Sequence, residues 1–483
     1  MISEWLEKAI SKNEVIRNDV YGFRVIVMCD PSKQQEIANE IKKLGIRVID
    51  SSVPGMILVD VPYPQYLDNL DKIHGVKYIT YDRKFYPLAR GIDEVIKSII
   101  IKTDPMLKNL KKNTIESLGY GLNLSDIPPI LKTLVYNILS IDNILAHPHL
   151  IAKLLSSIKE NAEVITKVDW EIVTNTKKLM GVPDYLTVDK ITTCVIDTGV
   201  RYGPGIGDMV CYVMTDIPDL PIDDMGHGSW CHACAFGLPS RSPYGYFIPV
   251  SIAKKTFHIK IFTAFGGCSS FTVTKAMFNA AYKHGANVIS MSLGGPLIDP
   301  VDKTPECSIA KGIALSTNTL LVCAAGNDGK EWSINSPGAS PYVVTIAAHG
   351  WKDPDKVASY SSRGPQGMYY QTHKDEFEDL INKYGERALK PTVAAIGGDV
   401  DGFIASACSL WYDGMMDYAP NGWDLMIGTS MATPHAAGMF GVLYDVGKIK
   451  NVDTALNLIY SRLGKYKDEN SGSGLLDFRK LVE

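Results

Sequence analysis

Four runs of apolar residues in the C-terminal part of the chain limit the fold more than any other feature of the sequence. Each run has the length of one strand, and they cover residues 191–197, 286–293, 319–325 and 342–348. Near-continuous apolar strands are typical of a parallel sheet that is buried on both faces. Helical patterns at 272–285 and 307–317 separate these runs. The sequence therefore predicts a doubly wound, mostly parallel α/β domain over residues 168–483.

Residues 20–88 alternate strand and helix patterns in a different order. Strand patterns at 23–29, 46–50, 56–61 and 76–82 flank helix patterns at 33–45 and 64–75. The βαββαβ order predicts a ferredoxin-like α+β domain, which by itself indicates no function. Residues 1–19 precede this domain as an extension with a short amphipathic helix.

A third region, residues 89–167, is predicted to be a helical linker or insertion between the two domains. An apolar stripe recurs at helical spacing in residues 128–139 and continues in 147–165. His147 and His149 are candidate metal ligands, but polar histidines at the start of an exposed helix are the simpler interpretation.

Composition argues against several classes of function. The net charge of −4 provides no basic surface for nucleic acid. No run of 18 apolar residues predicts a membrane span, and the N-terminus lacks the pattern of a secretory signal. The nine cysteines are odd in number and suggest no disulfide framework. We therefore expect reduced thiols and a location in the cytoplasm or in an intracellular particle.

The residue types that serine hydrolysis requires occur next to these predicted elements. Asp197 ends the first apolar run, and Asn327 follows the third. His227 lies between two glycines, and Ser430 precedes an apolar helix pattern. Such chemistry combines a hydroxyl, a base, an orienting carboxylate and an oxyanion donor. Turn formation by Asp197 and Asn327, and helix capping by Ser430, are the simpler interpretations of each residue alone.

These residues lie in motifs that resemble those of the subtilisin-like serine proteases, the subtilase family. The motifs are VIDTGV (195–200), GHGS (226–229), SMSLGGP (290–296), CAAGNDG (323–329) and GTSMATPHAAG (428–438). Segments at 357–365, 390–398 and 471–482 resemble further signatures of the family. The resemblance covers most of residues 170–483 in colinear order. It implies a subtilisin-like fold and hydrolysis of peptide bonds.

The resemblance also implies a catalytic role for four residues. Ser430 would attack the peptide carbonyl, His227 would accept its proton, and Asp197 would orient the imidazole. The side-chain amide of Asn327 would bind the oxyanion together with the backbone N–H of Ser430. This chemistry requires no cofactor.

Further residues would bind the substrate, a protein or peptide, if the resemblance holds. An extended substrate would pair with one strand, and two alanines and a glycine would flank the pocket for the residue before the cut. The strand residues are Ser292, Leu293 and Gly294, and the pocket residues are Ala324, Ala325 and Gly326. Asp328 beside this pocket would favour a basic residue there.

Residues 20–88 resemble the inhibitor-type prodomain of many subtilases. Such a prodomain assists folding and then inhibits by placing its C-terminal tail in the active site. The tail at residues 81–91 is the candidate inhibitory strand, and self-cleavage after it would activate the zymogen. The mature chain would begin near residue 90, or near 165–175 if the cut falls later.

One departure from the family pattern allows a different chemistry. A Ser-Trp pair replaces the usual Thr-His after His227-Gly228, and the run CHAC follows. A zinc-dependent hydrolase could use Cys231, Cys234 and either His232 or His227. Packing of both cysteines as small apolar residues is the simpler interpretation.

Two questions stay open at the level of sequence. Subtilases often bind structural calcium, but Asp223 and Asp224 alone do not define a calcium loop. A catalytically silent subtilase fold used for binding or assembly is the alternative to a protease.

Overall fold

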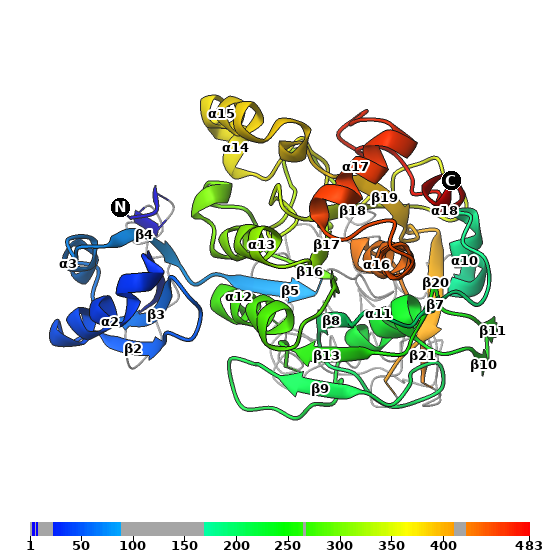
Figure 1. The fold of residues 1–483 in the computed structure, drawn as a ribbon, viewed down its shortest axis with the longest axis horizontal. Helices are drawn as coiled ribbons and strands as arrows, with labels where there is room; N and C mark the ends of the chain where they lie inside the picture. The colour runs from blue at the N-terminus through cyan, green and yellow to red at the C-terminus, as the bar shows by residue number, and fades with distance from the viewer. Residues whose placement is uncertain (1, 5, 8–22, 88–168, 264–266, 410–421) are drawn as a thin grey trace, which may run out of the picture.

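The computed structural model describes residues 2–4, 6–7, 23–87, 169–263, 267–409 and 422–483. Figure 1 shows a small N-terminal domain beside a larger C-terminal domain, with one strand, β5, extending from the first into the second. The predicted helical region at 89–167, with His147 and His149, lies outside the described residues. Most of the predicted N-terminal helix lies outside them as well.

The N-terminal domain is a four-stranded antiparallel sheet with two helices. The sheet order is β2-β3-β1-β4, and each neighbouring pair is antiparallel. The elements follow one another as βαββαβ. They are β1 (Phe23–Cys29), η1 (Pro31–Lys33), α2 (Gln34–Lys43), β2 (Arg47–Asp50), β3 (Met56–Val61), α3 (Tyr66–Asp71) and β4 (Val76–Tyr81), followed by β5 (Lys84–Pro87).

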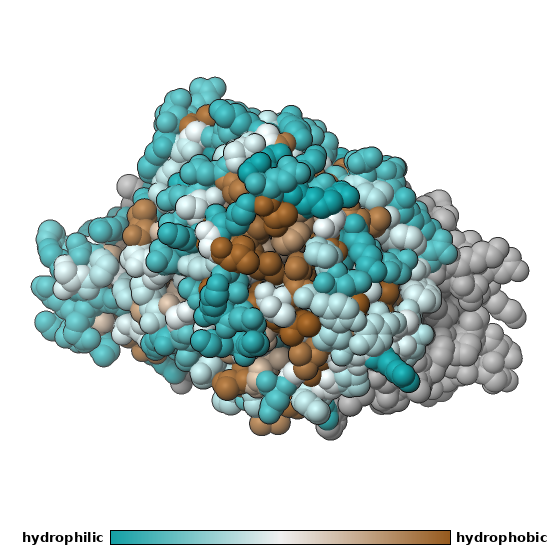
Figure 2. Space-filling view, turned by 45° about the vertical axis from the view of Figure 1, so that its right-hand side comes forward, coloured by the Kyte–Doolittle hydropathy of each residue, from teal (hydrophilic) through white to brown (hydrophobic). Residues whose placement is uncertain are grey.

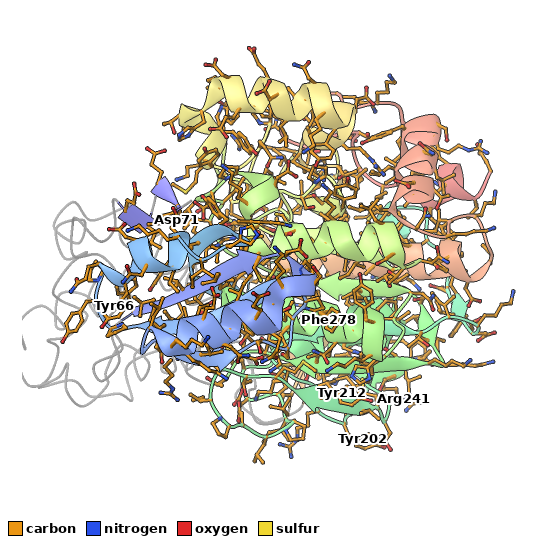
Figure 3. All side chains as sticks on the ribbon, turned by 60° about the vertical axis from the view of Figure 1, so that its left-hand side comes forward. Tyr66, Asp71, Tyr202, Tyr212, Arg241 and Phe278 are labelled. Atoms are coloured by element: carbon orange, nitrogen blue, oxygen red, sulfur yellow. The ribbon has the colours of Figure 1, made fainter. Side chains whose placement is uncertain are left out.

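Successive strand residues point to opposite faces of this sheet, and residues on both faces are buried. Val25 and Val27 of β1 belong to the same buried cluster as Ile37 of α2. Ile26, between them, belongs instead to a cluster of the C-terminal domain, against which Phe278 also packs. Figure 3 shows Phe278 close to the N-terminal domain. The second face of the small sheet is therefore the docking face.

Seven parallel strands form the central sheet of the C-terminal domain, which confirms the predicted doubly wound α/β fold. The sheet order is β19-β18-β17-β15-β8-β13-β9. The four apolar runs supply β18, β17, β15 and β8, which lie side by side. The strands are β8 (Thr193–Asp197), β9 (Val210–Val213), β13 (Thr256–Lys260), β15 (Val288–Met291), β17 (Leu320–Ala324), β18 (Val344–His349) and β19 (Val393–Ile396).

Helices cover both faces of this sheet. On one face, α11 (His227–Phe236) and α16 (Thr429–Asp445) share a buried cluster with Val195 of β8. On the other face, α12 (Ser270–Phe278) and α13 (Pro305–Ser316) share a cluster with Ile196. Helix α12 continues as the π-helix η3 (Asn279–Lys283). This alternation explains why β8 is apolar from Cys194 to Ile196.

The remaining elements surround this core. They are β6 (Asp169–Ile172), α10 (Val173–Leu179), β7 (Thr187–Val188), β10 (Ser240–Ser242), β11 (Gly245–Phe247), β12 (Ile252–Ala253), β14 (Cys268–Ser269), β16 (Leu293–Gly294), η4 (Val301–Lys303), α14 (Tyr369–Thr372), α15 (Lys374–Tyr384), η5 (Gly385–Ala388), β20 (Gly402–Ala407), β21 (Trp423–Met426), α17 (Val452–Leu463) and α18 (Phe478–Val482). Among the described helices, none has both the length and the apolar character needed to cross a membrane. Figure 2 shows hydrophobic residues gathered near the middle of one face, with hydrophilic residues around them.

Candidate active site

A buried carboxylate and an imidazole form the centre of the candidate site. Asp197 is the last residue of β8 and His227 is the first residue of α11, and their exposed fractions are 0% and 4%. Nδ1 of His227 lies 2.6 Å from Oδ1 of Asp197. Because a carboxylate can only accept, Nδ1 is the donor in this hydrogen bond. Nε2 has no hydrogen-bond partner within the described part of the chain.

Asp223 holds the start of α11 against the loop that follows Asp197. Its carboxylate accepts hydrogen bonds from the N–H groups of Gly226 (2.8 Å) and Ser229 (2.7 Å). It also accepts one from the hydroxyl of Thr198 at 2.8 Å. Burial raises the pKa of Asp223. The sequence indicated no role for Asp223 beyond a possible calcium ligand, although an acidic residue just before a helix start is a capping signal.

Lys260 provides the positive charge that faces Asp224. The Lys260 side chain is fully buried, and its Nζ lies 3.1 Å from Oδ1 of Asp224 and 3.0 Å from Oδ2 of Asp219. It also donates to the carbonyl oxygen of Ile222 at 2.7 Å. Lys260 pairs with Asp197 across β13 and β8. The loop before α11 is therefore attached to the strand beside the candidate carboxylate.

Ser430 lies in the first turn of α16 but does not cap the helix. The helix begins at Thr429 and its N-cap is Gly428, so the interpretation of Ser430 as the cap is wrong. The Ser430 hydroxyl donates to the carbonyl oxygen of Ser292 at 2.8 Å, and the Ser292 hydroxyl donates to the carbonyl oxygen of Ser430 at 2.9 Å. The second bond is possible because Pro434, four residues on, has no N–H to bond that carbonyl.

Asn327 is oriented by the start of the same helix. The backbone N–H and the hydroxyl of Thr429 both donate to Oδ1 of Asn327, at 3.0 and 2.9 Å. These two bonds hold the amide oxygen toward α16, so the amide nitrogen is directed away from Thr429. Gly326, which precedes Asn327, has φ of +121°, and a Cβ there would lie 2.0 Å from Nδ2 of Asn335. Only glycine fits this position.

The N-terminal domain contributes a strand to the C-terminal domain at the predicted substrate-binding segment. Strand β5 lies between β14 and β16 and is antiparallel to both (Figure 1). Phe85 in this strand is fully buried. The paired residues are Gly294 with Tyr86, Leu293 with Pro87, Cys268 with Phe85 and Ser269 with Lys84. Two residues predicted to bind an extended substrate thus already bind an extended segment of the same chain.

The predicted pocket residues lie at the end of β17. Ala324 and Ala325 are fully buried. The carboxylate of Asp328 lies 3.3 Å from Nδ2 of Asn335 and 3.4 Å from Oγ of Ser362, both of which donate to it. A preference of Asp328 for basic substrate residues stays a prediction.

The side chains of the CHAC run contact three different partners. The distances are 3.9 Å from Sγ of Cys231 to Nδ1 of His227, 3.4 Å from Sγ of Cys234 to Nδ1 of His435, and 3.4 Å from Nε2 of His232 to Oγ1 of Thr256. These side chains therefore do not form the zinc site that the sequence allowed.

A smaller cluster of possible metal ligands lies at the Asp–His pair itself. Among the described residues, Asp197, His227 and Cys231 are the group whose ligand atoms lie within 4.8 Å of one another. Burial and then the charge of Asp197 raise the pKa of Cys231 well above its ordinary value. The geometry favours a hydrogen-bonded Asp–His pair.

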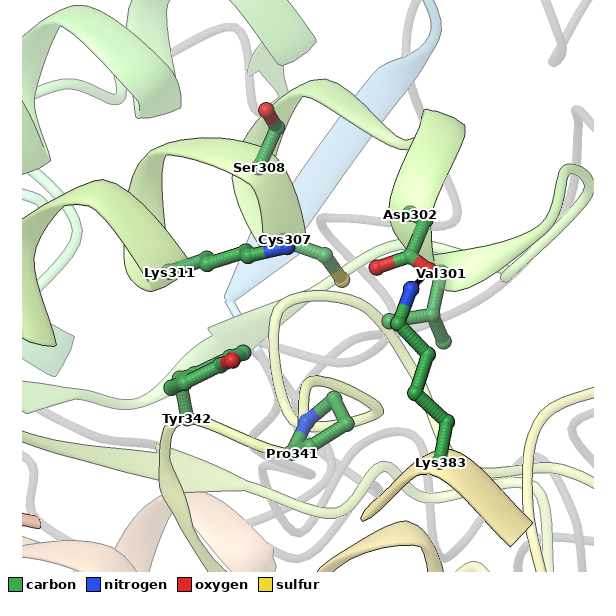
Figure 4. A pocket seen from close by; sticks show the side chains of 8 residues that line it. All are labelled: Val301, Asp302, Cys307, Ser308, Lys311, Pro341, Tyr342 and Lys383. Carbon is green, nitrogen blue, oxygen red and sulfur yellow. Dashed lines mark hydrogen bonds and ion pairs between the residues drawn. The ribbon is translucent and has the colours of Figure 1, made fainter. Parts of the chain in front are cut away.

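A separate pocket of about 220 Å³ lies between η4, α13 and α15 (Figure 4). Asp302 and Lys383 line it together with Lys311 and Tyr342. Nζ of Lys383 lies 2.5 Å from Oδ2 of Asp302, so these two charges neutralise each other. None of the predicted site residues lines this pocket, which separates it from the candidate active site.

The fold and the site define a doubly wound α/β protein that carries an Asp–His pair and a serine at the carboxyl ends of its parallel strands. The chain belongs to the subtilase family, since the sequence model of the Subtilase family matches residues 189–463.

Individual relatives agree with this assignment. The chain is 26% identical over 318 residues to serine protease AprX of Bacillus subtilis, covering 62% of this chain and 67% of the relative. It is 32% identical over 251 residues to pyrolysin of Pyrococcus furiosus, covering 47% of this chain and 17% of the relative.

A solved structure has a similar fold. Fervidolysin from Fervidobacterium pennivorans, a keratinolytic enzyme related to subtilisin, matches with a TM-score of 0.58 and 17% identity, covering 100% of this chain and 62% of that chain. The chain thus spans less than two thirds of pyrolysin and of fervidolysin.

Proposed function

We propose that this protein is a serine endopeptidase whose catalytic residues are Asp197, His227 and Ser430. The observation that carries the proposal is the 2.6 Å contact of the buried Asp197–His227 pair. In the proposed reaction Ser430 Oγ attacks the substrate carbonyl while Nε2 of His227 takes its proton. Asp197 stabilises the resulting imidazolium, and His227 then protonates the leaving amine.

The proposed attack requires one rotation of the serine side chain. Oγ of Ser430 donates to the carbonyl of Ser292, while Nε2 of His227 has no partner among the described residues. A turn about the Cα–Cβ bond would move the hydroxyl from the first acceptor toward the second. Catalytic hydrogen bonds often form only once the substrate is bound.

The Asn327 amide and the backbone N–H of Ser430 would bind the oxyanion. The amide oxygen of Asn327 already accepts two bonds from Thr429, which supports a donor role for its nitrogen. Donors of this kind stabilise charge that develops only in the transition state.

Replacing Asn327 with alanine should lower kcat by about 10²–10³, a magnitude measured for the corresponding change in subtilisin. KM should change little, because the lost bond forms mainly in the transition state. Steady-state kinetics on a peptide would measure both constants. Asn457→Ala, on the exposed face of α17, is the matched control. A rise in KM with kcat unchanged would contradict an oxyanion role for Asn327.

We further propose that the N-terminal domain is an intramolecular inhibitor that the enzyme releases by self-cleavage. Strand β5 occupies the substrate strand up to the Leu293–Pro87 pair. The next pair in this register would match Leu88 with Ser292, whose carbonyl contacts Ser430. The cut is therefore proposed between Leu88 and Ala89, one residue beyond the described strand.

Contacts away from the cleft support an inhibitor that docks specifically. Asp299 of the C-terminal domain is buried, and hydroxyls of the N-terminal part of the chain donate to it. Thr80 donates at 2.5 Å and Tyr78 at 3.2 Å, and Ser3 donates to the same carboxylate. A buried carboxylate with three donors would lose them all when the domain departs.

The cysteines support an intracellular location. No disulfide joins any of the nine cysteines, and eight of them are buried. Such thiols persist most easily in a reducing compartment.

A fluorophosphonate probe and intact-mass measurement test the proposal. Full-length wild type should be labelled and should separate into residues 1–88 and 89–483. Ser430→Ala should remain full length and unlabelled, whereas Ser461→Ala, at an exposed site on α17, should behave as wild type. Chelation of metals should change neither result.

Other outcomes would favour the alternatives. Wild type that stays unlabelled after limited proteolysis of its N-terminal region would favour a silent scaffold. Peptide hydrolysis that a chelator abolishes, without labelling by the probe, would favour a zinc-dependent hydrolase.

A further inference from the structure

A buried ion pair joins the residue before β5 to the C-terminal domain. Nη2 of Arg83 lies 2.6 Å from Oε2 of Glu306, and the two residues are 3% and 0% exposed. The guanidinium also lies 5.3 Å from the ring centroid of Phe85. Burying such a pair is costly unless further bonds satisfy the charges, so its surroundings decide whether it forms a binding site.

Those surroundings hold the carboxylate of Glu306, whereas Nε and Nη1 of Arg83 have no hydrogen-bond partner among the described residues. The hydroxyl of Ser336 donates to Oε2 of Glu306 at 3.1 Å, and the hydroxyl of Ser270 donates to Oε1. The backbone N–H of Ser270 donates to the carbonyl of Arg83 at 2.8 Å, which fixes the chain at this residue. Glu306 and Ser270 begin α13 and α12, and the N-termini of helices favour a carboxylate.

In a strand, alternate side chains point to the same side. Any segment that binds as β5 does therefore directs its residues at the positions of Arg83 and Phe85 toward the protein. Phe85 is fully buried, whereas the flanking Lys84 and Tyr86 side chains are about half exposed. Arg83 is two residues before Phe85 and points inward as Phe85 does. A chain in this strand therefore presents one residue to Glu306, at the position of Arg83.

We propose that Glu306, Ser270 and Ser336 form a specificity pocket for arginine in substrates of the mature enzyme. The inference rests on the proposed function. With the cut after residue 88, Arg83 is the sixth residue before the scissile bond. Once the inhibitor leaves, Glu306 binds the arginine of a substrate at that same position. Arginine suits the pocket better than lysine, because its planar guanidinium carries several N–H donors for the Glu306 carboxylate.

A pair of peptides tests the pocket in the processed enzyme made by the full chain. One carries the sequence RKFYPL before the cut, and the other replaces its arginine with citrulline, which has the same shape but no charge. Wild type should cleave the arginine peptide with a kcat/KM at least about 10-fold higher, as expected for one charge-assisted hydrogen bond. Glu306→Gln should reduce this ratio to below about 2-fold. Glu331→Gln, at an exposed acidic residue, is the matched control and should keep the preference.

Each result either supports or overturns the inference. Equal cleavage of both peptides by wild type would overturn the pocket and leave the proposed function intact, and this comparison needs no variant. An arginine preference that persists in Glu306→Gln would also overturn it. An enzyme that cleaves casein but neither peptide would overturn the pocket and the strand register. Absence of casein cleavage would overturn the proposed function, and the pocket with it.

Discussion

Replacing His227 with alanine is expected to slow self-cleavage by about 10⁶-fold, the factor found in subtilisin when its catalytic histidine is removed. The expectation follows from geometry, because His227 is the proposed base and its Nδ1 contacts Asp197. Without the imidazole, the Ser430 hydroxyl would have only the Ser292 carbonyl as acceptor. A carbonyl oxygen is too weak a base to accept the proton.

Intact-mass measurement over days would follow this loss. The His227→Ala chain should remain at 483 residues while wild type separates into two fragments. His284→Ala is a suitable control, because His284 precedes β15, at the amino end of that strand, and stacks on Tyr212. Self-cleavage of His227→Ala at a rate within 100-fold of wild type would contradict the proposed triad.

Docking of the N-terminal domain should weaken as the pH rises, with Asp82 as the responsible group. Burial raises the pKa of Asp82 from 3.8 to about 7, although its bond from the N–H of Phe271 and the charge of Arg24 oppose the shift. Asp216 and Glu306 raise it further. The docked state therefore binds more protons than the released state, in which Asp82 meets water. Docking is then strongest at acid pH. Its equilibrium constant falls as the pH rises through 7, by up to about 100-fold between pH 5 and 8.

Probe labelling at several pH values would measure this effect. The ratio of labelling rates in wild type and Asp82→Asn cancels every effect of pH that both proteins share. That ratio should rise from pH 5 to pH 8, because asparagine stays neutral while Asp82 ionises and releases the domain. Asp68→Asn, at an exposed position on α3, should show no such change. A constant ratio for Asp82→Asn would mean that Asp82 does not control release.

Much of the candidate site could be predicted because its residues carry local signals. Asp197 ends an apolar strand, His227 follows a glycine at a helix start, and Asn327 precedes an ordinary turn sequence. The carboxyl ends of parallel strands lie at the same end of the sheet, so the proximity of such residues follows from the fold class. Ser430 was placed correctly next to a helix start, but its assignment as the cap was wrong because Gly428 occupies that position.

The supporting residues carried no comparable signal. Asp223 and Lys260 are 37 positions apart in the printed sequence and meet the same loop only after β13 pairs with β8. Neither residue stands in a motif, since a carboxylate and a lysine are usually exposed. Their roles depend on burial, which the local sequence does not determine.

Hydrophobic periodicity and short glycine-flanked motifs are local properties of the chain, so the α/β architecture and the family could be predicted from the sequence. The way in which the two domains meet could be seen only in the folded structure. The contact between Arg83 and Glu306 joins residues 223 positions apart, and Phe85 is buried by a strand pairing with β14. Such contacts form when docking removes water from both surfaces, so their energies depend on positions in space that no short segment specifies.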